Sequence, residues 1–293
     1  MIGLGSMGMG VAASLLRAGH EVCGCDLRAE ARGEFAAVGG EAVARPDLLP
    51  PDLGALVLLV VNAAEADEAL FGPAGAVNGL PPGTLVLGSV TMAPQAARAL
   101  AARLSALGHL PLDAPVSGGP ARAREGALSV MASGSAAAFA AAEPIFSAIA
   151  AKVWRLGEEP GVGSTVKMVN QLLAGVHIAT AAEALAFGIR AGADPTMLFE
   201  VISASAGSSW MWQDRVPHIL AGDDAPRSAV GIFVKDLGIV LEEARTLTFP
   251  LPLAAAAHQL FLAAAAAGHA GRDDAFVIRV WQALTGIPLP AKE

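Results

Sequence analysis

The chain opens with three glycines spaced as in a dinucleotide-binding turn. Gly3, Gly5 and Gly8 fit the pattern G-x-G-x-x-G, and an apolar helical pattern follows directly. In such a turn the first glycine permits the tight bend, the second lets the backbone approach a pyrophosphate, and the third allows the helix to pack closely. The helix N-terminus then offers unpaired N–H groups to the phosphates. Ser6 and Met7, inside the turn, are further predicted cofactor contacts.

A carboxylate stands where the ribose of the dinucleotide needs one. Asp26 ends an apolar segment and lies 18 residues after Gly8, close to the roughly 20 expected. A carboxylate there accepts hydrogen bonds from both ribose hydroxyls and repels a 2′-phosphate, which favours NAD over NADP. Arg28 leaves the other choice open, because its guanidinium could meet a 2′-phosphate. Only Met1 and Ile2 precede the turn, so the first strand is expected to be clipped.

Strand and helix patterns alternate along the first half of the chain. Continuous apolar runs are typical of buried parallel strands, and periodic apolar residues that end at a glycine are typical of helices. This alternation predicts an α/β Rossmann domain with a mostly parallel, doubly wound sheet. The predicted strands are 21–26, 55–62, 84–90, 110–119, 128–134 and 151–157, and the predicted helices are 9–19, 28–38 and 94–108.

The character of the sequence changes after the glycine-rich segment 157–163. Residues 164–190 form one long apolar helical pattern, and helical patterns without a convincing strand continue to residue 286. A helix that is apolar nearly all round is expected to be buried between domains or between subunits. We therefore predict a dinucleotide-binding Rossmann domain over 1–161 and an all-α substrate and dimerisation domain over 162–293.

Composition and charge exclude several classes of function. The net charge is −8, with no cluster of Lys or Arg, which argues against a nucleic-acid partner. We recognise no signal peptide and no strongly apolar run of the roughly 20 residues that a membrane span needs, so we expect a cytoplasmic protein with no membrane partner. The two cysteines, Cys23 and Cys25, and six scattered His suit no metal site, and none is predicted. The absence of Tyr excludes hydride transfer that depends on a catalytic Tyr.

Two lysines stand out as candidates for proton transfer. Only four of the 19 basic residues are Lys, and Lys167 and Lys235 lie within apolar helical stretches. A desolvated ammonium can lose its proton whereas a guanidinium cannot, and proton transfer from a carbinol hydroxyl needs that property. At helical spacing Asn170 and Gln171 share a face with Lys167 and could hold a substrate hydroxyl. The other interpretation is a core lysine whose stem is buried and whose charge reaches solvent.

A glycine-rich loop follows one of the predicted strands. Ser117, Gly118 and Gly119 place a hydroxyl and unhindered backbone N–H groups at the strand end. Such a loop can cradle a substrate carboxylate. An ordinary turn is the alternative.

Four segments in this order resemble the β-hydroxyacid dehydrogenase family: GLGSMG, DAPVSGG, GVGSTVKMVNQ and FVKDLGIVLEEA. The family includes 3-hydroxyisobutyrate, 6-phosphogluconate and tartronate-semialdehyde enzymes, and the resemblance covers essentially the whole chain. It implies an N-terminal Rossmann domain, a C-terminal all-helical domain and an active site in the cleft between them.

The resemblance also implies roles for single residues. Lys167 would be the catalytic general acid/base, Asn170 would contact the substrate, and the loop 117–119 would hold its carboxylate and hydroxyl. Lys235 would lie near the nicotinamide ribose and the substrate, with Asp236 as a structural partner. Gln171, which replaces the second Asn of many members, is a further predicted contact to the substrate. The remaining predicted contacts to the cofactor are Asn62, Thr91 and Phe233.

The segment 206–238 resembles the subgroup that oxidises L-threonate and related four-carbon sugar acids at C2. Trp210 and Trp212 would flank the cleft, with Ser208 and Ser209 as hydroxyl-binding candidates, because each buried hydroxyl of a polyol acid needs a partner. The alternative is that both tryptophans are core or interface anchors. Arg215 is expected to be solvated at the surface, and the alternative is that it meets a carboxylate.

These observations predict NAD-dependent oxidation of a small anionic hydroxy acid, specifically a four-carbon sugar acid, by a homodimer or homotetramer. The alternative within the class is a 3-hydroxyisobutyrate dehydrogenase or tartronate-semialdehyde reductase, in which the reaction centre is C3. An alternative of another class is a non-catalytic dinucleotide-binding module, since some relatives keep the fold and lose the lysine. Imine reductases are a further possibility, and they typically replace this lysine.

Overall fold

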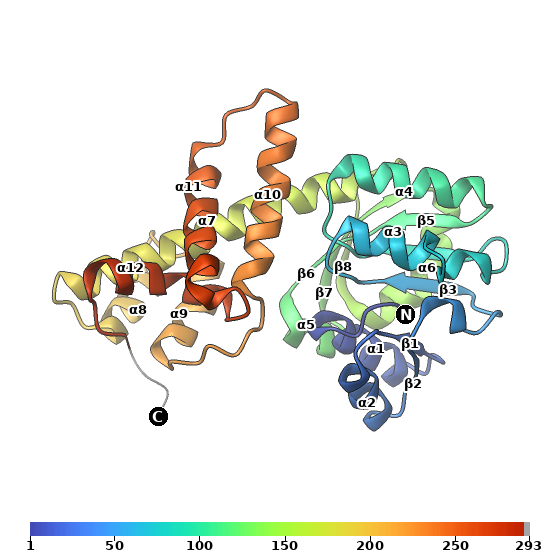
Figure 1. The fold of residues 1–293 in the computed structure, drawn as a ribbon, viewed down its shortest axis with the longest axis horizontal. Helices are drawn as coiled ribbons and strands as arrows, with labels where there is room; N and C mark the ends of the chain where they lie inside the picture. Colours follow the sequence, from blue (N-terminus) through green and yellow to red (C-terminus); the bar gives the residue numbers. More distant parts are fainter. Residues whose placement is uncertain (290–293) are drawn as a thin grey trace. The chain divides into compact units, whose positions relative to one another are not determined.

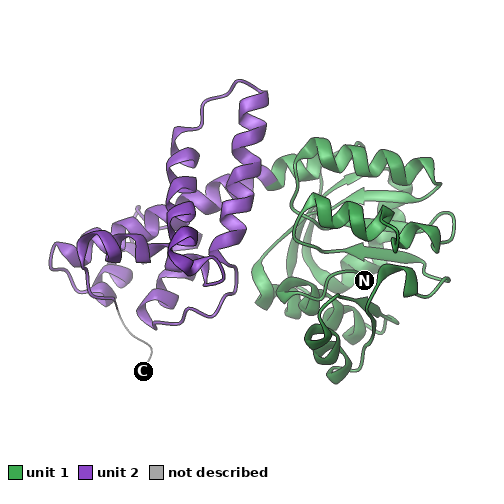
Figure 2. Cartoon of the chain, viewed as in Figure 1, with its two compact units in different colours: residues 1–167 green, residues 168–293 purple. Residues whose placement is uncertain are grey.

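The computed structural model describes residues 1–289 in two compact units, which Figure 2 shows in different colours. Their division falls after Lys167, a few residues beyond the domain boundary predicted after residue 161. The helix α7 (Val162–Arg190) begins in the first unit and continues without a break into the second. Residues 290–293 of the predicted second domain lie outside the described part.

The first unit contains a mostly parallel sheet, as the alternating pattern predicts. The strands β3, β4, β5 and β7 are neighbours in that order, and β6 and β8 both pair with β7. Only the β5–β7 and β6–β7 pairs are antiparallel. Ile2 bridges Cys25 and Leu58 in parallel, so it joins β1 to β3. The strands are β1 (Cys23–Cys25), β2 (Glu41–Val43), β3 (Ala55–Leu58), β4 (Leu85–Gly88), β5 (Leu110–Asp113), β6 (Val116–Ser117), β7 (Leu128–Gly134) and β8 (Ala150–Arg155).

Helices cover both faces of this sheet, which confirms the doubly wound fold (Figure 1). Along β4, Leu85 and Leu87 pack with α1 and α6, whereas Val86 between them packs with α3 and α4. This alternation places apolar side chains on both faces, as expected of a buried parallel strand. The helices are α1 (Ser6–Arg17), α2 (Ala29–Ala37), α3 (Ala63–Phe71), α4 (Pro94–Ala106), α5 (Gly119–Glu125) and α6 (Ala136–Ile149), with short turns η1 (Pro46–Leu48) and η2 (Ala76–Asn78).

The second unit is helical throughout its described part, as predicted. Ile178 and Leu185 of α7 pack with Leu237 of α10 and Phe261 of α11 in one apolar core. After α7 come α8 (Pro195–Ser203), α9 (Trp210–Leu220), α10 (Val230–Thr246), α11 (Pro252–Ala264), η3 (Ala265–His269), η4 (Asp274–Ile278) and α12 (Arg279–Thr285).

The helix α7 is long and apolar enough to cross a membrane by length and composition alone, which inspection of the sequence had not recognised. Of its most apolar window, 44% is buried inside the protein. The core helix of a soluble protein has the same composition, because it too must bury apolar side chains on several sides.

Candidate active site

The glycine turn has the shape that a pyrophosphate needs. Gly3 has φ +93°, and a Cβ there would lie 2.3 Å from the Leu59 carbonyl oxygen. A Cβ at Gly8 would lie 2.0 Å from the Gly3 carbonyl oxygen, so both positions require glycine. Beside Gly5 there is open space within 4 Å. Gly5 is also the N-cap of α1 and provides no side-chain cap, so the first helical N–H groups are available to a phosphate.

Asp26 lies directly beside this turn. Its carboxylate accepts hydrogen bonds from the Leu4 N–H at 2.9 Å, the Arg28 N–H at 2.9 Å and Arg28 Nε at 3.2 Å. Burial raises the pKa of Asp26, but the hydrogen bonds from Arg28 and Leu4 outweigh it and hold that pKa below its usual value. Asp26 is therefore ionised at neutral pH, and the guanidinium of Arg28 is paired with it.

The predicted cofactor contacts Asn62 and Thr91 follow β3 and β4 at the carboxyl edge of the parallel strands, where ligands of such sheets bind. Asn62 caps α3: its Oδ1 accepts the Glu65 N–H, and its Nδ2 donates to Glu65 Oε1, each at 2.8 Å. The N-cap role explains an Asn at this position without a cofactor, so its contact with the cofactor stays a prediction.

The loop predicted to hold a carboxylate follows β6. Gly118 and Gly119 have φ +138° and +74°, which favour glycine at both positions. Beside Gly119 the space is open within 4 Å, whereas a Cβ at Gly118 would lie 3.0 Å from Cδ of Arg122. Ser117 is the last residue of β6 and directly precedes these two glycines.

A buried carboxylate anchors the start of α7, which the sequence analysis did not identify. Asp113, the last residue of β5, accepts hydrogen bonds from the N–H groups of Gly161 and Ser164, both at 2.8 Å, and from Ser164 Oγ at 2.7 Å. The Gly163 N–H donates to Ser133 Oγ at 2.9 Å. Burial raises the pKa of Asp113, and these hydrogen bonds act against it. The sheet thus caps the helix that carries Lys167.

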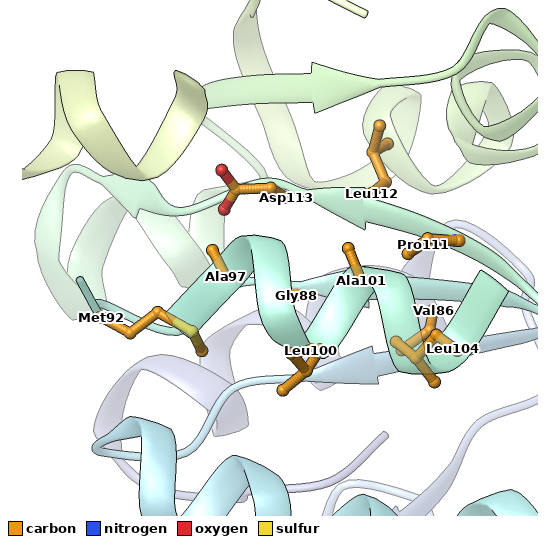
Figure 3. Close-up of a pocket in the computed structure, with 10 residues that line it drawn as sticks. All are labelled: Val86, Gly88, Met92, Ala97, Leu100, Ala101, Leu104, Pro111, Leu112 and Asp113. Carbon is orange, nitrogen blue, oxygen red and sulfur yellow. The ribbon is translucent and has the colours of Figure 1, made fainter. Parts of the chain in front are cut away.

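Asp113 also borders a small cavity lined by residues of β4, β5 and α4 (Figure 3). Figure 3 shows the Asp113 carboxylate pointing away from Leu100 and Leu104 of α4. The cavity volume of about 20 Å³ holds about one water molecule. It is too small for a substrate.

We expect Asp113→Ala to lower the free energy of unfolding by about 3 kcal/mol, because two buried N–H groups and one hydroxyl lose their acceptor. Ser133→Ala, which removes one acceptor from the same helix start, should lower it by about 1 kcal/mol. Chemical denaturation of both variants measures the difference. Equal losses would contradict the central role of Asp113.

Lys167 lies on the second turn of α7 and is 7% exposed. Asn170 and Gln171 follow one turn later, and both belong to a chain of hydrogen bonds that reaches α10. Asn170 Nδ2 donates to Gln171 Oε1 at 2.9 Å, and Gln171 Nε2 donates to Asp236 Oδ2 at 2.5 Å. The other carboxylate oxygen of Asp236 pairs with Lys235 Nζ at 2.6 Å. We call these four residues the relay.

The relay has buried inner members and accessible ends. Gln171 and Asp236 are 8% and 2% exposed, whereas Asn170 is half-buried and the Lys235 side chain is 20% exposed. The relay joins two pairs that the sequence analysis treated apart, Asn170 with Gln171 and Lys235 with Asp236. Their roles toward a substrate stay predictions.

The tryptophans occupy different environments. Trp212 is 4% exposed and belongs to the core of the second unit, which supports the core-anchor alternative for this residue. Trp210 is 52% exposed, so its side chain is accessible to a ligand. Ser209 caps α9 by accepting the Trp212 N–H at 3.0 Å, and Ser208 Oγ accepts Gln213 Nε2 at 3.0 Å.

Two further residues lie deeper than the sequence suggested. The expected surface position of Arg215 is wrong: its side chain is 11% exposed, and its Nε donates to the buried Asp274 at 2.6 Å. The partner 59 residues away could not be read from local sequence. Phe233, a predicted cofactor contact, is 3% exposed and stacks on Phe261 with ring centroids 5.2 Å apart.

Comparison with known proteins decides the family. Residues 1–157 match the family model described as the NAD binding domain of 6-phosphogluconate dehydrogenase. Residues 161–281 match the model described as NAD-binding of NADP-dependent 3-hydroxyisobutyrate dehydrogenase. The L-threonate dehydrogenase of Cupriavidus necator is 55% identical over 100% of this chain and 97% of its own length. The chain belongs to the β-hydroxyacid dehydrogenase family.

Other members of the family are similar over their full length. The 3-hydroxyisobutyrate dehydrogenase of Pseudomonas aeruginosa is 34% identical over 96% of this chain and 97% of its own. A crystal structure from Salmonella typhimurium described as 3-hydroxyisobutyrate dehydrogenase is 48% identical, has a TM-score of 0.90, and covers 95% of this chain and 98% of its own. This β-hydroxyacid dehydrogenase is therefore an NAD(P)-dependent oxidoreductase that acts on a small acid, which confirms the predicted fold, enzyme class and cofactor class.

Proposed function

We propose that this β-hydroxyacid dehydrogenase oxidises a four-carbon sugar acid of the L-threonate type at C2. One observation carries the proposal: five relatives called L-threonate dehydrogenase are 46–55% identical over 99–100% of this chain. A 3-hydroxyisobutyrate dehydrogenase is the second candidate, because the similar Salmonella structure carries that description. Comparing turnover of the two substrates separates the candidates.

In the proposed reaction, Lys167, the loop 117–119 and Lys235 have separate roles. Lys167, uncharged before the reaction, takes the proton of the C2 hydroxyl as hydride leaves C2, and C2 becomes a carbonyl carbon. The nicotinamide, when bound, accepts that hydride. The loop 117–119 holds the carboxylate through backbone N–H groups, and the ammonium of Lys235 adds positive charge for an anionic substrate.

We propose NAD as the preferred cofactor. The turn at Gly5 offers open space and free helical N–H groups for the pyrophosphate. The ionised Asp26 beside it suits two ribose hydroxyls and repels a 2′-phosphate. The pairing of Arg28 with Asp26 occupies the cation that a 2′-phosphate would need.

We expect kcat/KM to be at least about tenfold higher with NAD than with NADP, and Asp26→Ser to remove most of that preference, because the repelling charge disappears and Arg28 is released. Kinetics with both cofactors measure the ratio. Arg28→Ala is the control and should keep the preference for NAD. A wild-type enzyme faster with NADP would contradict this assignment.

We further propose that the protein works in the cytoplasm as a homodimer or homotetramer. An apolar stripe on α7 supports self-association: Val162, Val166, Val169 and Leu173 are 36–51% exposed, and their spacing places them on one face. Light scattering of the purified protein measures the assembly directly. A monomer at micromolar concentration would contradict it.

A further inference from the structure

Four buried ionisable side chains form a cluster in the second unit that the proposed reaction does not use. Arg215 donates to Asp274 from Nε at 2.6 Å and from Nη2 at 3.1 Å. His218 Nδ1 lies 3.0 Å from Asp273 Oδ1. Both carboxylates are fully buried, and both of their partners belong to α9. We call these four residues the joint.

The joint fixes the segment 270–274 against the start of α10. The N-cap residue of α10 provides no side-chain cap. The first N–H groups of the helix donate instead to carbonyl groups of that segment: Val230 to Arg272 and Gly231 to Ala270, each at 2.9 Å. These bonds satisfy N–H groups that a helix start leaves without a partner. The place where α10 begins therefore depends on the segment that the joint holds.

The loop before α10 is held by the same pair of acidic residues. Asp273 Oδ2 accepts the N–H of Arg227 at 3.1 Å. The N–H of Asp274 donates to the carbonyl oxygen of Ser228 at 2.8 Å. The helix α9, this loop and the start of α10 thus share one buried anchor.

Stability alone does not require charges in this place. Apolar residues of similar volume in place of a buried ion pair are often neutral or stabilising, whereas removal of one partner is costly. A two-point contact between a guanidinium and a carboxylate adds a fixed geometry, because the planar fork matches both oxygens. The geometry that the joint fixes is the placement of α10.

The helix segment that is anchored in this way carries Lys235. This lysine lies five residues after Val230, which is about 7.5 Å along the helix. Asp236, its neighbour and partner, is tied to Gln171 of α7 through the relay. Lys235 therefore lies between two anchors of α10, the joint at the start of the helix and the relay one turn later.

We propose that the joint places the Lys235 ammonium for the anionic substrate, so that its four members are positioning residues of the reaction. The inference rests on the proposed role of Lys235. A joint that loses its geometry leaves the ammonium in the protein but away from the substrate, which weakens substrate binding. Proton transfer to Lys167 does not depend on it.

The test measures KM for L-threonate at saturating NAD, together with the denaturant midpoint of unfolding. Lys235→Met should raise KM at least about tenfold, because the ammonium is lost. The pair variant Arg215→Met/Asp274→Leu should keep the wild-type midpoint or exceed it, yet raise KM at least about fivefold with kcat changed less than about threefold. Adding Lys235→Met to the pair variant should give no higher KM than Lys235→Met alone, because the joint acts through this lysine.

Two controls separate positioning from general damage. Glu242→Leu/Arg245→Met removes an exposed ion pair of the same kind from α10 and should leave KM unchanged. His218→Asn keeps an N–H donor for Asp273 and should keep the wild-type KM. His218→Leu removes that donor and should raise KM at least about fivefold, which tests the inference even if the pair variant fails to fold.

A pair variant with wild-type stability and wild-type KM would show that the joint is only structural and would overturn the inference. Increases in KM that multiply when Lys235→Met is added would overturn it as well. An unchanged KM in Lys235→Met would overturn the proposed role of this lysine and the inference with it. If the wild-type enzyme oxidises 3-hydroxyisobutyrate and not L-threonate, the proposed substrate is wrong, and the same comparison with that acid tests the inference.

Discussion

Lys167→Ala should lower kcat by about 10²–10⁴-fold, the usual contribution of a general acid or base. The Lys167 side chain is carried on the second turn of α7, which Asp113 holds to the sheet. The loss should appear in kcat, and the dissociation constant of NAD should change less than about threefold, because the proposed cofactor contacts, the glycine turn and Asp26, do not include this side chain.

Two matched variants sharpen that result. Lys167→Arg should not restore turnover, since a guanidinium keeps its proton. Lys152→Ala removes an exposed lysine that lies over the Trp154 ring and should leave kcat unchanged. Full turnover by Lys167→Ala would refute the proposed proton transfer.

Gly8→Ala should weaken NAD binding at least about tenfold and lower the free energy of unfolding by about 2–3 kcal/mol. The added methyl would come within 2.0 Å of the Gly3 carbonyl oxygen and within 2.9 Å of its carbon. Both are backbone atoms, so the start of α1 must move away from the turn. That movement would displace the helical N–H groups that we propose bind the pyrophosphate.

Substitutions at two other glycines separate the effect on protein stability from the effect on NAD binding. Gly5→Ala meets open space, so it should leave the melting temperature nearly unchanged yet weaken NAD binding, because its methyl enters the space of the pyrophosphate. Gly33→Ala, at an exposed and uncrowded site in α2, should stabilise the protein by up to about 1 kcal/mol with NAD binding unchanged. Calorimetry of the three variants measures both quantities. A Gly8→Ala protein with wild-type stability and affinity would contradict the geometry of the turn.

Much of the fold follows from local pattern. The run from Ala55 to Leu58 and the run from Leu85 to Gly88 are apolar throughout because helices cover both of their faces. Several elements escaped prediction, and for three of them the reason is equally physical. The strand β2 has only three residues, none of them buried. The helices α3 and α6 follow the N-cap residues Asn62 and Ser135, whose capping hydrogen bonds are clear only once the chain is folded.

The candidate-site residues that act within one short segment of the sequence could be predicted. The glycine turn, Asp26 and the Lys167 helix are such segments. Residues that act through partners far along the chain were not predictable in this way: Asp113 holds Ser164, 51 residues away, and Gln171 meets Asp236 across 65 residues. These pairings depend on tertiary packing, which neither spacing nor composition encodes.

The most direct test of the proposed function is the rate of NADH formation with L-threonate, 3-hydroxyisobutyrate, D-glycerate and 6-phosphogluconate, each at several concentrations. We expect L-threonate with NAD to have the highest kcat/KM, by at least about tenfold over the other acids. A higher kcat/KM for 3-hydroxyisobutyrate would keep the family and the role of Lys167 but contradict the proposed substrate.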